Sequence, residues 1–217
     1  MIRKIVLPVI AATAFLAYGC AEPPTKEIEL AKTSIDSVVA EGGEVYAPKE
    51  TRDLNDSFGK AMEEVQSQEK VLFKKYDKAK ELLAVTTNEA KELDKIVITR
   101  KAAAKENAEN AIRNIESKIN EIVTLLNSDE AKKGKGEALD VAIMLQDMNG
   151  YSESVNDTKK LIDSGDYLQV PEKVELIQSK IGIIENEVKA VIEKRKQAAE
   201  KKVLLAKKKD TKKPKKK

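Results

Sequence analysis

Hydrophobic side chains recur every three or four residues along most of the chain, which is the spacing of one face of an α-helix. A first helix is predicted from about Thr25 to Glu41-Gly42-Gly43, because glycine tolerates the left-handed conformation that closes helices. A second is predicted from about Lys49 to Val85, and a third from about Asn88 to Asn127. The second carries the stripe Leu54, Phe58, Met62, Val65, Leu72, Tyr76, Ala79 and Leu83, and the third has the heptad spacing Ala108, Ile112, Ile115, Ile119, Ile122 and Leu126.

The second half of the chain continues the helical spacing. A polar stretch with glycines from Asn127 to Gly136 indicates a break, and a shorter helix follows from Glu137 to Asp163, with a kink at Asn149-Gly150. Ser164-Gly165-Asp166 indicates another turn, and the last helix begins at Pro171, since proline suits the first helical position. The segments predict an all-α fold, an elongated antiparallel helical bundle with coiled-coil-like hairpins. The helical body spans 25–206, and a flexible basic tail follows at 207–217.

The N-terminal segment indicates export and lipid attachment. Arg3 and Lys4 precede an apolar stretch, Ile5 to Ala17, that is shorter than the roughly 20 residues needed to span a bilayer. Residues 1–19 are therefore interpreted as a signal peptide. The sequence Leu16-Ala17-Tyr18-Gly19-Cys20 resembles the lipobox of bacterial lipoproteins, which implies cleavage before Cys20 and its acylation with chains such as palmitate. The alternative is a free or buried cysteine after an ordinary signal peptide.

A lipidated Cys20 would fix the protein to a membrane without a spanning helix, because two or more acyl chains anchor stably. Lipoproteins retained in the inner membrane typically carry Asp after the acylated cysteine, whereas this chain has Ala21. The resemblance therefore favours the outer membrane, with the body facing the periplasm. Residues 20–24 form the lipidated cysteine and a stiff proline-rich tether, since Pro23 and Pro24 resist helix formation.

The composition excludes most enzyme chemistries. The 217 residues are 41% hydrophobic and 35% charged, with 4% aromatics, no His, no Trp and one Cys, so imidazole bases, histidine metal sites and thiolate zinc sites are absent. Gly134-Lys135-Gly136 lacks the spacing of a phosphate-binding loop and is predicted to be a turn. Glu63-Glu64 is predicted to be a solvated acidic pair. We expect no enzymatic activity, no cofactor and no metal site.

Charge is separated along the chain. Residues 194–217 hold 13 basic and two acidic residues, a net charge of +11, whereas residues 20–193 hold 25 basic and 35 acidic residues, a net charge of −10. The tail favours polyanionic partners, either peptidoglycan or anionic lipids, and its lack of aromatics argues against nucleic acid. The alternative is a tail that solubilises the protein or folds back on its acidic body. The predicted contact residues are Lys207, Lys208, Lys209, Lys212, Lys213, Lys215, Lys216 and Lys217.

A second resemblance lies after the first predicted helix. The stretch from Gly42 to Glu50, Gly-Gly-Glu-Val-Tyr-Ala-Pro-Lys-Glu, resembles a family of bacterial lipoproteins with a helical domain of unknown function, which has a Gly-rich turn and a Tyr-Ala-Pro triplet. The family's later Gly-x-Tyr element is matched by Gly165-Asp166-Tyr167. The resemblance implies a helical periplasmic domain and no particular activity. Physically, the residues indicate a structural turn made by Gly42, Gly43, Tyr46 and Pro48.

Two classes of function fit these observations. The first is a structural or adaptor lipoprotein whose body or basic tail engages another envelope component. The second is a binding module whose helices accept a protein partner or ligand in a groove. The layout of a lipid at one end and Lys217 at the other resembles Braun-type lipoproteins, in which a terminal lysine is joined to peptidoglycan. That resemblance adds covalent coupling to ionic contact as an alternative for the tail.

Overall fold

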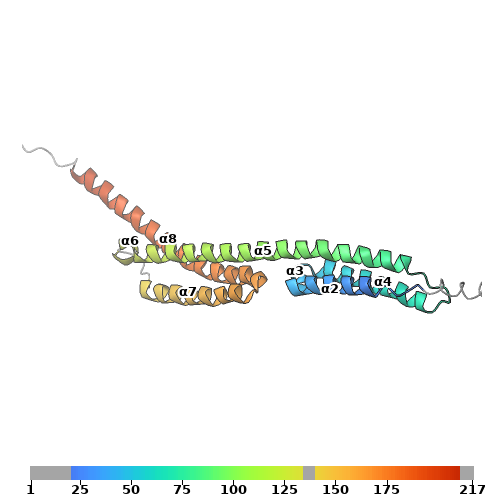
Figure 1. Ribbon diagram of the computed structural model, residues 1–217. Helices are drawn as coiled ribbons and strands as arrows, with labels where there is room; N and C mark the ends of the chain where they lie inside the picture. The colour runs from blue at the N-terminus through green and yellow to red at the C-terminus, as the bar shows by residue number, and fades with distance from the viewer. Residues whose placement is uncertain (1–20, 134–139, 211–217) are drawn as a thin grey trace, which may run out of the picture. The chain divides into compact units, whose positions relative to one another are not determined.

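The computed structural model describes residues 21–133 and 140–210, omitting the side chains of Lys133 and 206–210. The part of the chain that it describes is helical and has no strand, which confirms the predicted all-α fold (Figure 1). The contacts divide the chain into two compact units, 1–102 and 103–217, and α5 contributes to both. The elements are α2 (Thr25–Glu41), α3 (Gly43–Tyr46), α4 (Pro48–Glu69), α5 (Asp77–Asn127), α6 (Asp129–Lys133), α7 (Val141–Ser164), the 3₁₀ turn η1 (Tyr167–Gln169) and α8 (Val170–Asp210).

The first unit is a bundle of α2, α4 and the beginning of α5. Ion pairs fix the directions of the helices: Lys80 and Lys101 of α5 pair with Glu27 and Glu41 of α2, so these two helices run parallel. Helix α4 runs antiparallel to both, because Lys78 and Arg100 of α5 pair with Glu64 and Glu50 respectively. Successive helices are therefore antiparallel, as the sequence predicts.

The core of the first unit consists of two clusters joined by Phe58. One cluster lies near the α2–α4 turn and buries Ile35, Val38, Ala47, Leu54, Ala90, Leu93 and Val97. The other lies at the opposite end of the helices and buries Ala31, Ala61, Val65, Tyr76, Ala79 and Leu83. The predicted stripes therefore face inward, except at Leu72, which is exposed.

The predicted break between the second and third helices is in the wrong place. Helix α4 ends at Glu69, a loop follows at 70–76, and α5 runs without interruption through Val85 and Asn88. Two threonines that weaken helix propensity sit inside α5, but both are buried, and their hydroxyls donate to carbonyls one turn earlier. These bonds, 2.9 and 2.8 Å long, join Thr86 to Leu82 and Thr87 to Leu83.

The second unit packs the end of α5 against α6, α7 and α8. Helices α5 and α8 run parallel, since Lys118 pairs with Glu185 at 2.6 Å and Lys189 pairs with Glu121 at 3.9 Å. Helix α7 lies between them in the chain and runs antiparallel to α8. The single core cluster contains the heptad residues Ala108 to Leu126 of α5 together with Met144, Met148, Val155, Val174, Ile177, Ile181, Ile184 and Val188.

The turns of the second unit follow local chemistry. Helix α7 begins at Val141, where the Asp140 carboxylate accepts a 3.2 Å hydrogen bond from the Ile143 amide; the predicted start at Glu137 lies outside the described residues. The helix is continuous across Asn149-Gly150, where the sequence predicts a kink. Gly165, with φ of 87°, ends α7 at the predicted turn, and α8 begins at Val170, one residue before Pro171.

Helix α8 extends beyond the hydrophobic core of the second unit. Ile192 is its last buried residue, and after the half-buried Arg195 the described side chains up to Leu205 are exposed. The backbone remains helical to Asp210, so the predicted boundary at 206 lies inside a helix. The last described turns of α8 therefore hold their shape without a covering helix from the described residues.

Candidate functional site

The predicted structural turn brings Gly42, Gly43, Tyr46 and Pro48 together between α2 and α4. Gly42 has φ of 100°, a left-handed conformation that glycine adopts readily, and a Cβ there would lie 3.1 Å from the Tyr46 ring. Gly43 is buried, and a Cβ on it would lie 2.6 Å from a Val38 methyl group. Pro48 occupies the start of α4, where its missing amide hydrogen costs nothing. The turn needs glycine at both positions.

Two basic residues of α5 hold this turn. Arg100 donates to the Tyr46 carbonyl at 3.1 Å and to the Glu50 carboxylate at 2.8 Å. The neighbouring Lys101 donates to the Glu41 carbonyl at 3.2 Å. The hydrogen bond from Arg100 lowers the pKa of Glu50 and raises that of Arg100 itself. The geometry gives the turn a packing role, since its exposed backbone carbonyls are bound from within the unit.

An open groove lies in the second unit, between α5 and the first half of α8. Its volume is about 740 Å³. Its lining includes two small residues, Ala111 and Gly182, and also Ile183, which is 68% exposed although it is a large apolar side chain. Amide side chains add hydrogen-bonding capacity at the edge. The remaining lining residues are Asn114, Pro171, Val174, Glu175, Gln178, Ser179 and Asn186.

A smaller groove of about 380 Å³ lies on another side of α8, between α8 and α7. It is lined by Leu161 and Ile177 together with Leu176, which is 59% exposed. Helix α8 therefore exposes a large apolar side chain at each of two grooves. A helix with one apolar face would match either groove, because apolar side chains spaced by three or four residues would enter between the ridges.

No group of three metal-ligating side chains occurs within 21–133 and 140–210. Of the predicted acidic pair, Glu63 is exposed, but the Glu64 side chain is only 15% exposed and is bound, not solvated: it accepts from Lys78 at 2.7 Å and from Gln68 at 3.0 Å. These bonds lower the pKa of Glu64, which is the opposite of what a general acid requires.

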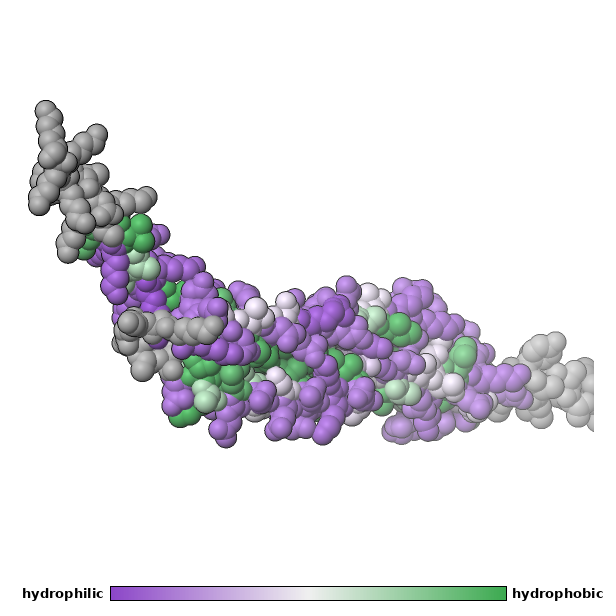
Figure 2. Space-filling model, turned by 90° about the vertical axis from the view of Figure 1, so that its left-hand side faces the viewer, coloured by the Kyte–Doolittle hydropathy of each residue, from purple (hydrophilic) through white to green (hydrophobic). Residues whose placement is uncertain are grey.

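Most of the predicted contact residues cannot be placed. Cys20 and the lysines of 212–217 lie outside the described residues, and Lys207, Lys208 and Lys209 continue the backbone of α8 without described side chains. Among the described helices, none is long and apolar enough to cross a membrane. Figure 2 shows an apolar patch on the last part of α8, next to residues drawn in grey. This part of the helix exposes Val203, Leu204 and Leu205.

Several residues of interest were not anticipated from the sequence. Arg100 and Lys101 contact residues more than 50 positions away, and no local pattern indicates this. Ile183 could have been found from the sequence. Ile177, Ile181 and Ile184 have the spacing of one buried helix face, and Ile183 adds a large apolar residue to the polar side. Leu72 was assigned to the buried stripe, although Val71-Leu72-Phe73 is a run without helical spacing.

Comparison with protein-family models, curated proteins and solved structures returned no match to this chain.

Proposed function

We propose that the protein is a lipoprotein of the cell envelope, anchored to the outer membrane through acylated Cys20 and facing the periplasm. Its role is structural or adaptor-like: the helical body carries a basic C-terminal segment to an anionic partner. The partner is an anionic lipid surface or the peptidoglycan. The proposal follows from the lipobox-like sequence before Cys20, from the charge separation along the chain, and from the way α8 leaves its core.

The observation that carries the adaptor role is the exposed basic end of α8. Lys196, Lys201 and Lys202 are exposed on turns that cover no part of the described core, so they are free to face a partner. The packed part of α8 ends where Arg195 donates to the carbonyls of Glu130 and Ala131 at 2.7 and 2.9 Å. Each lysine held near an anionic surface contributes about 1 kcal/mol, so several together suffice for measurable binding.

The anchor is tested by Cys20→Ser. The variant should appear in the soluble fraction after cell lysis, because the acyl chains that would hold the body at the membrane are lost. Mass spectrometry of the parent protein purified from membranes should show acyl groups on Cys20, the first residue after cleavage. A Cys20→Ser protein that remains on membranes after a salt wash would show that something other than the lipid holds it.

The tail is tested by deleting 207–217 and, separately, by replacing its lysines with glutamine. Both variants should lose retention on purified sacculi or on vesicles containing phosphatidylglycerol, while the parent is released by salt. Lys217→Arg is the matched control for covalent coupling, since it keeps the charge and removes the amine. If sacculi boiled in detergent retain the parent but not Lys217→Arg, the linkage is covalent. Unchanged retention in every variant would place specificity in the helical body.

A second candidate function is a binding module, favoured by the 740 Å³ groove beside Ile183. Its occupant would be an amphipathic helix of an envelope protein. A photo-crosslinking residue at position 183 should then capture a protein partner in the native envelope, whereas one at exposed Lys180 on the same helix should not. Equal capture at both positions, or none at either, would argue against the groove and leave the tail as the contact.

A further inference from the structure

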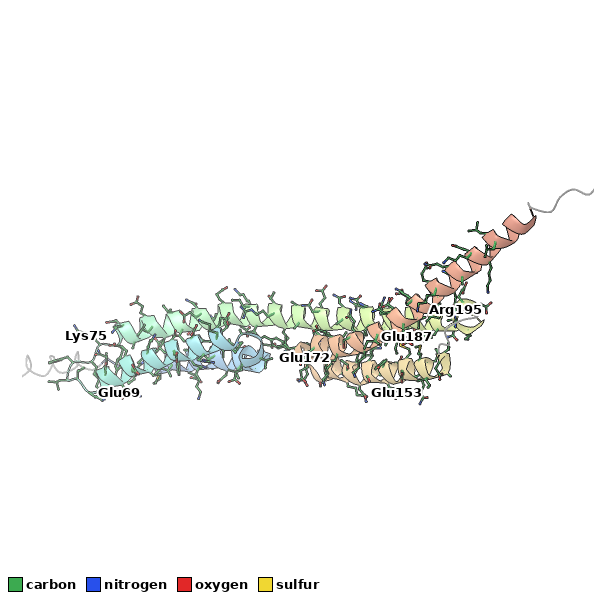
Figure 3. All side chains as sticks on the ribbon, turned by 180° about the vertical axis from the view of Figure 1, so that it is seen from behind. Glu69, Lys75, Glu153, Glu172, Glu187 and Arg195 are labelled. Carbon is green, nitrogen blue, oxygen red and sulfur yellow. The ribbon has the colours of Figure 1, made fainter. Side chains whose placement is uncertain are left out.

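The loop between α4 and α5 presents Leu72 and Phe73, which are more exposed than any other described large apolar side chain of the first unit. Val71 is 44% exposed, Leu72 84% and Phe73 73%. The three are consecutive, so they form one apolar tip rather than scattered surface positions. Lysines flank the tip on both sides, and Figure 3 shows Glu69 and Lys75 where α4 ends and α5 is about to begin. From Glu69 to Lys78 there are four lysines and two acids, a local net charge of +2.

The tip is held in place from beneath. Gln68 accepts a hydrogen bond from the Lys75 amide at 3.1 Å and donates one to Glu64 at 3.0 Å. Glu64 is also bound by Lys78 at 2.7 Å, and Tyr76, the last residue of the loop, is buried in the core. Ordered loop ends and exposed apolar residues together mean that the tip is presented outward and has not simply failed to pack.

The tip lies at the end of the first unit where the anchor enters. Glu27, in the first turn of α2, pairs with Lys80 in the first turns of α5, and Ile28 packs against the cluster that contains Tyr76. Pro24 is itself buried, so the tether is packed onto the unit at this point. The four residue-to-residue steps from Cys20 to Pro24 can span at most about 14 Å, because an extended chain covers no more than 3.6 Å per residue. A bilayer holding acylated Cys20 is therefore close to this end.

We propose that Val71-Leu72-Phe73 inserts into the interfacial region of the anchoring membrane, with Lys70, Lys74 and Lys75 contacting anionic lipid headgroups. This rests on the proposed acylation of Cys20. The acyl chains hold the chain at the membrane, and the tip supplies a second point of attachment at the same end of the helices. Two points restrict how the first unit tilts, whereas one lipidated residue would leave it free to turn about its tether.

A lipid surface accounts for both properties of the loop. Apolar side chains enter the boundary between headgroups and acyl chains, and lysines beside them face the anionic headgroups. An amphipathic protein helix would need apolar positions three or four residues apart to face it, whereas the tip consists of consecutive residues at the end of a bundle. Its position next to the tether then selects the membrane as the occupant.

The test uses the absence of tryptophan from the chain. In the acylated full-length protein, reconstituted in vesicles of phosphatidylethanolamine and phosphatidylglycerol, Leu72→Trp introduces one fluorophore at the tip. Val45→Trp introduces one on α3, which is also exposed but lies at the opposite end of the first unit. Brominated acyl chains should quench the fluorescence of Leu72→Trp at least about twofold and leave Val45→Trp unchanged. Bromine quenches at short range, so it reaches only an indole that has entered the bilayer. Phe73→Trp is the replacement if Leu72→Trp does not fold.

The outcomes separate this inference from the proposed anchor. Quenching at the tip alone supports insertion, and its loss when Lys70, Lys74 and Lys75 are all changed to Gln supports the headgroup contact. Equal quenching at both positions, or none at the tip of a vesicle-bound protein, overturns the inference while the anchor stands. If the protein carries no acyl group, the proposed anchor fails. The Cys20→Ser, Leu72→Trp double variant, added to the same vesicles, then tests insertion of the tip without an acyl group. Quenching of its fluorescence supports insertion, and the absence of quenching overturns it.

Discussion

Arg100 of α5 donates a 3.1 Å hydrogen bond to the carbonyl oxygen of Tyr46, in the turn between α2 and α4. The same guanidinium reaches the Glu50 carboxylate at 2.8 Å, in the first turn of α4. One side chain of α5 therefore binds both the connection between α2 and α4 and the first turn of α4. The glycines of the turn provide its backbone shape, and Arg100 provides a link from outside it.

We expect Arg100→Met to lower the melting temperature slightly, because the variant keeps most of the apolar stem but removes both hydrogen bonds. The effect should be small and should shrink at high salt, since the ion pair with Glu50 is solvent-accessible. Thermal melts at low and high ionic strength measure it. Arg113→Met on the same helix, where the pair with Glu109 joins no second helix, is the control. Equal losses in the two variants would show that the turn gains nothing from Arg100.

Gly43→Ala should destabilise the protein by about 1–3 kcal/mol, because the new Cβ would overlap packed groups that have little room to move. It would lie 2.6 Å from a Val38 methyl group and 2.9 Å from the Val38 carbonyl oxygen. Gly59→Ala, in the exposed interior of α4, meets nothing within 4 Å and should stabilise by about 0.5–1 kcal/mol. Urea unfolding of both variants gives the two signs. A neutral Gly43→Ala would mean that the turn can open without cost.

Two substitutions at Tyr76 distinguish the contribution of the packed ring to stability from that of the hydroxyl group. The side chain is only 2% exposed, and the hydroxyl has no hydrogen-bond partner among the described residues. Tyr76→Phe should therefore be neutral or stabilising by about 1 kcal/mol, since it removes an unsatisfied buried group. Tyr76→Ala should cost about 3–5 kcal/mol through the cavity that it leaves. Chemical denaturation of both measures the difference, and a clear loss in Tyr76→Phe would point to a partner for the hydroxyl.

Helical stripes were predictable because burial imposes a period that the sequence retains. Ile112, Ile115, Ile119 and Ile122 of α5 and Ile181, Ile184 and Val188 of α8 are all buried, as their spacing indicates. The turn glycines at 42 and 165 were also predictable, because glycine readily adopts the positive φ that closes helices. Both residues have positive φ in the structure. These signals are local, so one sequence suffices to find them.

The ends of α4 and α5 were not predictable by the same means. The loop at 70–76 contains no glycine or proline, and its apolar residues continue the count of a helical stripe at Leu72. It is the Gln68 side chain, by accepting from the Lys75 amide, that helps to close the loop. Conversely, the break predicted between Val85 and Asn88 is absent, and Thr86 and Thr87 are buried inside α5.

The candidate site was predictable only in part. The turn residues were found because Gly and Pro have specific backbone geometries, whereas Arg100 was missed because its contacts are distant in sequence. Grooves depend on which faces remain uncovered after packing, and no local pattern states this. The exposed tip at Leu72 belongs to the same class, since its residues look like core until the loop is placed.

Glu185 is the most covered acid among the interhelical ion pairs that link α5 to α8. Its side chain is 13% exposed and accepts from Lys118 of α5 at 2.6 Å and from Lys189 of its own helix at 2.5 Å. The bond from Lys118, and then that from Lys189, lowers the pKa of Glu185 below its ordinary value of 4.5. The same pairing raises the pKa of Lys118 above 10.5.

These shifts predict where the pair stabilises the second unit. Because the folded pKa of Glu185 is depressed, its contribution is fully present above pH 4.5 and is lost as pH falls through the folded pKa. The Lys118 contribution is present below pH 10.5 and is lost as pH rises through its raised pKa. Melting temperatures of the parent should therefore fall on acidification below pH 4.5. Glu185→Gln should be less stable at neutral pH and show a shallower acidic fall, whereas Glu187→Gln, exposed on the same helix, should follow the parent. Parallel acidic falls in all three proteins would mean that other carboxylates control acid unfolding.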